Sequence, residues 1–346
     1  MSDDHRILYL CRREVEAICK ELDLVAIVAE ALAAHAAGDV VLPAEAYLSW
    51  TNARGETARS LNMPGSLGPP LNVAGTKVIN ANPANPARRI ARASGLTLLF
   101  DPLTARINCV LEAAFVSAMR TASVTALAAD LLGNGQIEIL GILGAGALAN
   151  AHLKLLPRRL NNLQRTKIFD LQPERALELA QEIAPELAGR RISLDVVSSA
   201  ELAVRDADLV VALTTTTEAY IRYQWLAPGT VAVNISLDDF EPEVILRADR
   251  LIVDDWELIA ADDKRLLGRM YRQGLVVGPR ATGDSEMARR VDAELGEVIR
   301  HPERGRLSAD DIILVNPFGL SIEDISVAAH AFEWASARGV GTYLEV

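Results

Sequence analysis

The second half of the chain shows a repeating pattern that restricts the fold strongly. From residue 137 onward, short runs of Val, Ile and Leu alternate with stretches of helical periodicity. This alternation is typical of a parallel sheet that is covered by helices on both faces. The predicted strands are 137–143, 166–170, 192–197, 208–213, 230–235 and 250–254, and the predicted helices between them are 147–157, 173–187 and 199–205. Helical patterns follow over 255–272 and 285–300, then a strand in "DIILVNPFG" and a helix from Ser321.

The part of the chain before residue 137 is organised differently. Helical spacing predicts one or two helices over 14–37 and a long one over 111–133, and short apolar runs around a turn at Asn52–Gly55 predict antiparallel strands. Prolines predict a non-helical loop from Asn80 to Arg92. We therefore expect an α/β fold with two domains. A doubly wound Rossmann domain (126–315) is inserted into a mixed α/β domain built from both ends of the chain (1–125 and 316–346).

A glycine turn follows the first strand of the predicted parallel sheet. Its sequence, Gly144-Ala145-Gly146-Ala147-Leu148-Ala149, fits the G-x-G-x-x-G/A pattern of dinucleotide-binding domains. The N–H groups at the start of the next helix are suited to a pyrophosphate. The next strand ends in Asp170, slightly beyond the usual spacing of about 20 residues. A carboxylate there accepts hydrogen bonds from ribose hydroxyls and repels a 2′-phosphate. The motif thus predicts an NAD site, and the alternative is a glycine turn that binds no dinucleotide.

Hydroxyl side chains end another strand of the same sheet. Thr214 and Thr215 lie in "ALTTTTEAY", where ligands of open parallel sheets bind. They are candidate neighbours of the cofactor, and capping of a turn is an equally good interpretation. We also assign Thr121 and Ser236 to the cofactor site.

Composition excludes several classes of function. The 346 residues carry a net charge of −11, which disfavours nucleic acid and anionic membranes as partners. The three cysteines form no CxxC pair, and no clustered histidines suggest a metal site. Neither a signal peptide nor a run of about 18 apolar residues is evident. We expect a cytoplasmic protein without a metal.

Two cations lie in apolar or small-residue surroundings. Lys77 in "GTKVINA" and Arg120 in "SAMRTAS" require a partner, because burying an unpaired charge is costly. One interpretation is a clamp for a substrate carboxylate, and the other is an internal salt bridge. Arg59 and Arg92 are further candidate cations. Asp239, at the end of a strand on the presumed cofactor edge, is a candidate general acid/base; Asp238 competes with it, and a helix N-cap is the structural alternative.

Several motifs in order along the chain resemble those of the ornithine cyclodeaminase/mu-crystallin family. They are "GTKVINANPAN", "LLFDP", "SAMRTASVTALAA", "GILGAGALANAH", "AELGEVI" and "NPFGLSIEDI". The resemblance implies that the domain formed by both chain ends binds substrate and forms a homodimer, and that the inserted domain binds NAD. It also implies a small substrate derived from an amino acid. Within the family, Lys77 and Arg120 would bind the substrate carboxylate, Asp239 would be the acid/base, and Gly144, Gly146, Ala149 and Asp170 would hold NAD.

Other stretches resemble one branch of that family. "RSLNMPGSLG", "NPANPARRIARAS" and "NISLDDFEPEV" are similar to the branch that oxidises N-(2-amino-2-carboxyethyl)-L-glutamate to 2,3-diaminopropionate and 2-oxoglutarate. There, Arg59 and Arg92 match cations that meet the acidic groups of the substrate. Two positions depart from the pattern: Glu45 stands where cyclodeaminases carry an arginine, and Asp238 where the branch more usually has a basic residue. Alternatives are a cyclodeaminase, an amino-acid dehydrogenase, an imine or ketimine reductase, or a mu-crystallin-like binding protein without turnover.

Overall fold

The computed structural model describes residues 6–282 and 288–345. These residues form two compact units. Among the described residues, the terminal unit comprises 6–120 and 319–345, and the central unit comprises 121–282 and 288–318. The chain thus leaves the terminal unit, completes the central unit and returns. The sequence-based boundaries at 125/126 and 315/316 lie a few residues from this division.

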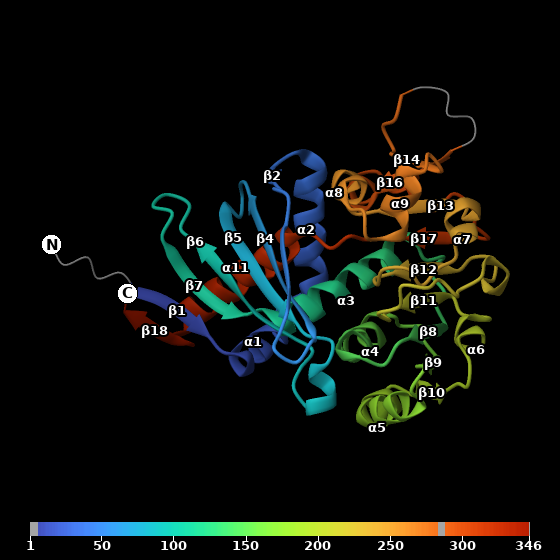
Figure 1. Ribbon diagram of the computed structural model, residues 1–346, viewed down its shortest axis with the longest axis horizontal. Helices are drawn as coiled ribbons and strands as arrows, with labels where there is room; N and C mark the ends of the chain where they lie inside the picture. The colour runs from blue at the N-terminus through green and yellow to red at the C-terminus, as the bar shows by residue number, and fades with distance from the viewer. Residues whose placement is uncertain (1–5, 283–287, 346) are drawn as a thin grey trace. The chain divides into compact units, whose positions relative to one another are not determined.

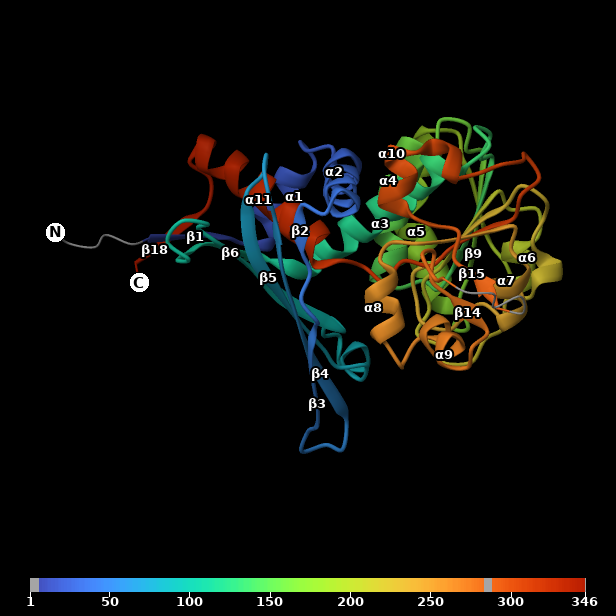
Figure 2. The same ribbon diagram turned by 90° about the horizontal axis from the view of Figure 1, so that it is seen from above.

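The terminal unit contains an eight-stranded, mostly antiparallel sheet (Figure 1). Its order is β18-β1-β7-β6-β5-β4-β2, and β3 also pairs with β4. The strands are β1 (Arg6–Leu10), β2 (Val40–Val41), β3 (Ala46–Thr51), β4 (Thr57–Leu67), β5 (Val73–Ala81), β6 (Ala93–Phe100), β7 (Ile107–Glu112) and β18 (Thr342–Glu345). The expected turn at Asn52–Gly55 is confirmed, and it joins β3 to β4 in a hairpin that projects past the other strands of its unit (Figure 2).

Helices cover this sheet and form a core with it. They are α1 (Arg12–Cys19), α2 (Leu24–Ala37) and α11 (Ser321–Arg338), and α11 packs against β4, β5, β6 and α2. The prediction that the loop from Asn80 to Arg92 is non-helical is wrong over a short stretch. A 3₁₀ helix, η1 (Asn85–Arg88), forms there, because Pro86 lies in its first turn, where a missing N–H is tolerated.

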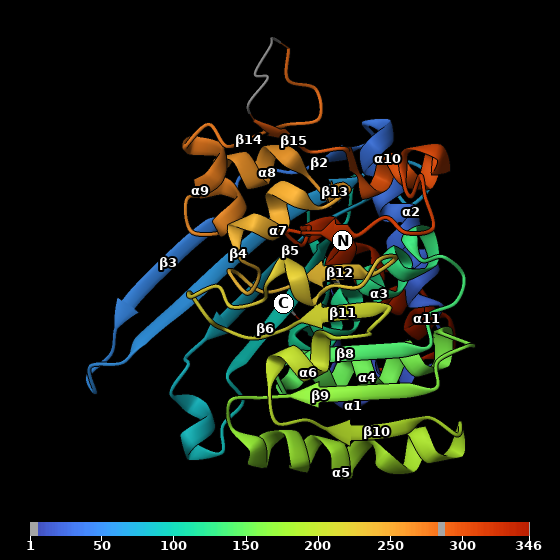
Figure 3. The same cartoon turned by 90° about the vertical axis from the view of Figure 1, so that its right-hand side faces the viewer.

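The central unit contains the predicted parallel sheet. Its order is β10-β9-β8-β11-β12-β17-β13-β16, with every neighbouring pair parallel (Figure 3). The strands are β8 (Ile139–Leu143), β9 (Arg165–Phe169), β10 (Ser193–Val196), β11 (Leu209–Ala212), β12 (Val231–Asn234), β13 (Arg250–Val253), β16 (Ala293–Glu294) and β17 (Ile313–Val315). Strand order reverses direction at β8 and β11, which confirms the doubly wound Rossmann fold.

Helices lie on both faces of the parallel sheet, as continuous apolar strands require. Figures 1 and 2 show α4 (Ala147–Arg159) and α5 (Pro173–Gly189) on one face, and α6 (Ala200–Val204) and α7 (Pro242–Arg247) on the other. The remaining helices are α3 (Ala113–Leu132), α8 (Trp256–Ala261), α9 (Leu266–Arg272), α10 (Leu295–Arg300), η2 (Tyr223–Trp225) and η3 (Pro302–Arg304). Of the described helices, α3 alone has the length and apolarity to cross a membrane, and 67% of its apolar window is buried, as in core helices of globular proteins.

One predicted helix is largely wrong. A helix was expected over 285–300, but β15 (Arg289–Arg290) pairs with β14 (Val276–Val277), and β16 pairs with β13. The helix α10 begins only at Leu295, and residues 283–287 lie outside the described residues. Pairing of β15 with β14 in a separate two-stranded sheet, and of β16 with β13, overrides the local helical pattern, since local propensity is weaker than tertiary context.

Candidate functional site

The glycine turn joins β8 to α4 in the central unit. Gly144 has φ +97°, and a Cβ on it would lie 3.1 Å from the carbonyl carbon of Leu213 at the end of β11. Its N–H donates to the Phe169 carbonyl at 2.8 Å. A Cβ on Gly146, in contrast, would meet nothing within 4 Å. The first glycine is therefore required by the fold, and the second leaves open space in front of α4.

The beginning of α4 is suited to an anion. Gly146 is the N-cap residue, and no side chain among the described residues caps this helix end. The first N–H groups of a helix have no partner within the helix, so they are available to a phosphate. Ala147, Leu148 and Ala149 supply these groups in the first turn.

Asp170 lies against this turn. Its Oδ2 accepts the Ala145 N–H at 2.8 Å, and its Oδ1 accepts the Gln172 N–H at 2.8 Å. Each carboxylate oxygen can accept more than one hydrogen bond, so capacity remains for ligand hydroxyls. The predicted juxtaposition of the acid and the glycine turn is present in the structure.

Asp239 follows β12 at the carboxyl edge of the same sheet, and three hydroxyl groups donate to its buried carboxylate. Thr214 Oγ1 lies 2.6 Å and Tyr220 Oη 2.9 Å from Oδ1, and Ser236 donates to Oδ2. Burial raises the pKa of Asp239, while the three hydroxyls act in the opposite direction. A buried carboxyl group with a raised pKa and hydroxyl partners is suited to accept and return a proton.

Asp238 has a different role from its neighbour. Its Oδ1 accepts the N–H of Leu266, the first residue of α9, at 2.8 Å, and its Oδ2 pairs with Arg269 at 3.0 Å. Asp238 thus binds the first N–H of α9 from a distant part of the chain. Neither acid is itself an N-cap residue, because Arg265 precedes α9 and Glu241 precedes α7.

The remaining hydroxyl candidates are more scattered. Besides contacting Asp239, Ser236 donates to the Ala212 carbonyl at 3.3 Å. Thr215 is exposed, and Thr121 is buried in α3.

Lys77 and Arg120 form a buried ionic cluster in the terminal unit. Lys77, 1% exposed, places Nζ 2.6 Å from Asp324 Oδ2 and 3.2 Å from Ser117 Oγ. Arg120 places Nη1 2.7 Å from Glu323 Oε2 and Nε 3.2 Å from Asp324 Oδ2. Burial lowers the pKa of Lys77, and the charge of Asp324 opposes this shift. The internal salt bridge that the sequence left open is thus present for both cations.

Sequence reasoning missed the two acids of this cluster. Glu323 and Asp324 lie in the first turn of α11, where the motif "NPFGLSIEDI" ends. A signal was available, since two buried cations require two buried counter-charges. Tyr220 was missed as well, although it lies in the quoted stretch "ALTTTTEAY".

Arg59 and Arg92 approach each other in the terminal unit. Partial desolvation, followed by the positive charge of Arg59, lowers the pKa of Arg92. Burial lowers the pKa of Lys77, and the negative charge of Glu45 is the smallest of the influences that oppose this shift. Glu45 therefore adds negative charge near Lys77.

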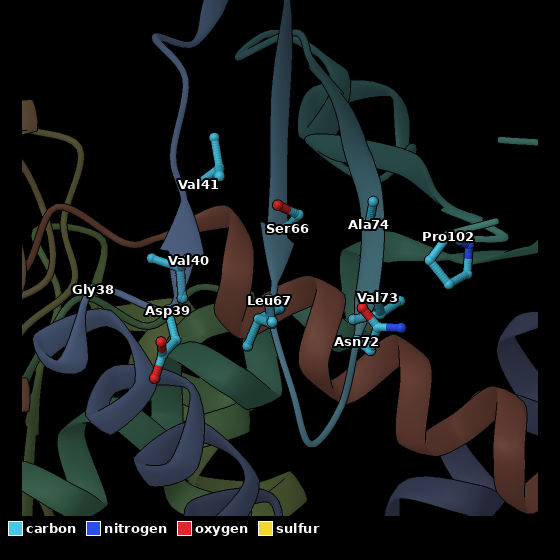
Figure 4. A pocket seen from close by; sticks show the side chains of 11 residues that line it. Gly38, Asp39, Val40, Val41, Ser66, Leu67, Asn72, Val73, Ala74 and Pro102 are labelled. Atoms are coloured by element: carbon cyan, nitrogen blue, oxygen red, sulfur yellow. The ribbon is translucent and has the colours of Figure 1, made fainter.

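A pocket of about 300 Å³ opens elsewhere in the terminal unit (Figure 4). Asp39, Ser66 and Asn72 contribute polar side chains to it. Its described lining includes none of the predicted site residues, so it does not belong to the candidate site.

Comparison with known proteins identifies the family of this chain. Residues 6–339 match the sequence profile of the ornithine cyclodeaminase/mu-crystallin family. The chain belongs to this family. N-((2S)-2-amino-2-carboxyethyl)-L-glutamate dehydrogenase of Staphylococcus aureus is 33% identical over 99% of both chains.

Solved structures of similar proteins share the fold. The crystal structure of CmnK is 34% identical, with a TM-score of 0.88 over 99% of this chain and 98% of the other. An archaeal alanine dehydrogenase, a dimer with bound NAD, is 25% identical, with a TM-score of 0.81 over 99% of each chain. The family resemblance and the fold class predicted from the sequence are confirmed.

Proposed function

We propose that this family member is an NAD-dependent oxidoreductase that acts on the C–N bond of an N-substituted amino acid. The proposed substrate is N-(2-amino-2-carboxyethyl)-L-glutamate, and the products are 2,3-diaminopropionate and 2-oxoglutarate. The similarity to the Staphylococcus aureus dehydrogenase over the whole chain supports this choice. The small substrate is the expected partner. The archaeal dimer with bound NAD supports a homodimer, and a cytoplasmic location is part of the same proposal.

The central unit supplies the proposed cofactor site. The N–H groups from Gly146 to Ala149 would hold the pyrophosphate, and Asp170 would accept the ribose hydroxyls. NAD⁺ bound there would accept a hydride from the substrate carbon that bears the secondary amine. Thr121, Thr214, Thr215 and Ser236 are proposed as further neighbours of the cofactor.

Asp239 is proposed to move the proton. The observation that carries the proposal is the buried Asp239 carboxylate, which Thr214 connects to the glycine turn along one sheet edge. As the amine is oxidised to an imine, the nitrogen loses its proton. Water then adds to the C=N bond, and cleavage of the C–N bond releases the amine and the 2-oxo acid. Asp239 accepts a proton in the first step and assists the addition of water in the second.

The terminal unit is proposed to bind the substrate carboxylates. Arg120 carries five N–H donors, and Glu323 and Asp324 fix its orientation through Nη1 and Nε. With Lys77 it would hold the carboxylate beside the reacting carbon, since a fixed orientation accelerates reaction strongly. Arg59 and Arg92 would meet the second acidic group.

The test is incubation of the purified protein with NAD⁺ and candidate amines. NADH absorbance reports oxidation, and mass spectrometry identifies the products. Formation of 2,3-diaminopropionate and 2-oxoglutarate supports the proposal. Proline with ammonia would indicate a cyclodeaminase, and a 2-oxo acid from a simple amino acid would indicate an amino-acid dehydrogenase. No NADH with any of these amines, and no imine reduction in reverse, would contradict enzymatic function and favour a mu-crystallin-like binding protein.

A further inference from the structure

Glu56, in the turn before β4, accepts hydrogen bonds from an unusual number of side chains. Arg88 donates to it through Nη1 at 2.5 Å and Nη2 at 3.0 Å. Asn52 and Asn82 each donate through Nδ2 at 2.9 Å. These donors lower the pKa of Glu56 to about 2, and the hydrogen bonds from Arg88 contribute most to this shift. One carboxylate therefore joins the β3–β4 hairpin to the loop that precedes β6.

The two joined segments each present an arginine. Arg59 lies on β4 and is paired in the sheet with Ala81 on β5. Ala81 is paired in turn with Ala93 on β6. Arg92 directly precedes Ala93, and the Asn82 N–H closes the loop on the Arg92 carbonyl at 2.9 Å. Sheet register and the Glu56 contacts thus bring Arg92 close to Arg59.

This arginine pair is not neutralised by the chain. Within residues 6–282 and 288–345, neither guanidinium has an ion-pair or side-chain hydrogen-bond partner. Two like charges repel each other, so the loop must be held in place for the pair to persist. A bidentate bond between arginine and carboxylate is the strongest fixed contact available for this purpose.

We propose that Glu56 is a positioning residue that, through Arg88, holds Arg92 beside Arg59 in readiness for a carboxylate. The inference rests on the proposed function in that the carboxylate belongs to the glutamate half of the substrate. Preorganisation of the pair reduces the ordering cost of binding, so its loss weakens binding of the dicarboxylate and leaves the chemical step intact.

The test compares Glu56→Gln with Glu16→Gln, which removes an exposed acid paired with Arg12 in the same unit. Glu56→Gln is expected to raise KM for the proposed substrate about tenfold, to change kcat less than about twofold, and to raise the Kd of 2-oxoglutarate but not of pyruvate in calorimetric titrations with NADH present. Arg88→Met should change KM, kcat and Kd in the same way. The double variant Glu56→Gln/Arg88→Met should show no greater rise in KM or Kd than either single variant. Glu16→Gln should change none of these values.

Several outcomes would overturn the inference. These are an unchanged KM and Kd in Glu56→Gln, an equal loss of 2-oxoglutarate and pyruvate binding, a lower melting temperature alone, or a wild-type protein that does not bind 2-oxoglutarate. A wild-type protein that binds 2-oxoglutarate selectively, loses this binding in Glu56→Gln, yet oxidises no amine would contradict the proposed function and support the role of Glu56.

Discussion

The Thr214 hydroxyl donates a 2.6 Å hydrogen bond to Oδ1 of Asp239, from a strand end that also touches the glycine turn. The Thr214 nitrogen lies 3.2 Å from the position that a Cβ on Gly144 would occupy. The Leu213 N–H donates to the Leu143 carbonyl at 2.8 Å, so two neighbouring residues after β11 connect the end of β8 with the loop that follows β12. This connection ties the geometry of the carboxylate to that of the nucleotide-binding turn.

Asp239→Asn is expected to lower kcat/KM by about two to four orders of magnitude, because an amide cannot take up the proton. NADH binding and the melting temperature should change little. Asp238→Asn is the matched control. It weakens the capping of α9 and the pair with Arg269, so it should cost about 1 kcal/mol of stability and leave activity within a few-fold. Steady-state kinetics with thermal unfolding would decide, and comparable activity losses in both variants would contradict the assignment.

Tyr220→Phe is expected to shift the pH profile of kcat/KM. The Tyr220 hydroxyl stabilises the charged form of Asp239, so its removal raises the pKa of this carboxyl further above the ordinary range. The negative charge of nearby Asp238 acts in the same upward direction. The acid limb of the profile should therefore move to higher pH. Tyr223→Phe in η2 is the control, and a limb that stays in place or moves to lower pH would contradict the role of Tyr220.

Alanine at the two glycines separates folding from cofactor binding. At Gly144, φ +97° and the nearby Leu213 carbonyl predict a loss of stability of at least about 1 kcal/mol. At Gly146 a methyl group meets open space, so Gly146→Ala should melt like the wild type and raise the Kd for NADH at least about tenfold, because the methyl group occupies the space that the pyrophosphate needs. Fluorescence titration with NADH would measure this, and unchanged affinity in Gly146→Ala would exclude the proposed pyrophosphate site.

Lys77→Met removes one of the two positive charges that pair with the buried Asp324 carboxylate. We expect a loss of about 3 kcal/mol in urea unfolding, since breaking a buried pair strands the remaining charge. Lys77→Met with Asp324→Asn should recover part of that stability and remain inactive. Additive losses in the double variant would show that the two residues are not coupled.

His152 predicts a further pH dependence, of stability. It is buried in α4, with Nε2 2.9 Å from Thr125 Oγ1 and Nδ1 2.7 Å from the Leu148 carbonyl, and burial lowers its pKa from 6.5 to about 4. The folded state resists protonation, so stability is complete above about pH 6.5 and falls as the pH drops towards 4, by about 3 kcal/mol in total. His152→Gln should lack this pH-dependent loss of stability, because glutamine does not titrate. Denaturant unfolding at pH 7 and pH 5 would measure the difference, and an equal fall in both proteins would contradict it.

The sequence predicts well those features that depend on neighbouring residues. Continuous apolar strands and a glycine turn followed by Asp170 are local patterns, and the parallel sheet and the turn lie where they indicate. Short elements are harder to predict. Neither β16, with two residues, nor α7, with six, was predicted, because pairing and packing by distant parts of the chain hold such segments in place.

Side-chain partners were the least predictable part of the site. Lys77 is identifiable from its apolar surroundings, whereas the identity of its counter-ion depends on which helix crosses the sheet. The sequence does not show which of Asp238 and Asp239 is the candidate acid/base. The two differ because Asp238 binds the first N–H of α9, and this contact depends on where α9 begins. The contacts of Glu56 likewise arise from the folding of a loop against a hairpin, and charge patterning along the chain carries no information about them.

The pairing of Lys77 with Asp324 also bears on how the protein is made. The two residues lie 247 positions apart, and the whole central unit is synthesised between them. A ribosome therefore presents Lys77 long before its counter-charge exists. The central unit can fold while still attached to the ribosome, but α11 must emerge before the sheet of the terminal unit can bury its lysine. The core between that sheet and α11 can therefore be completed only after the central unit has been synthesised.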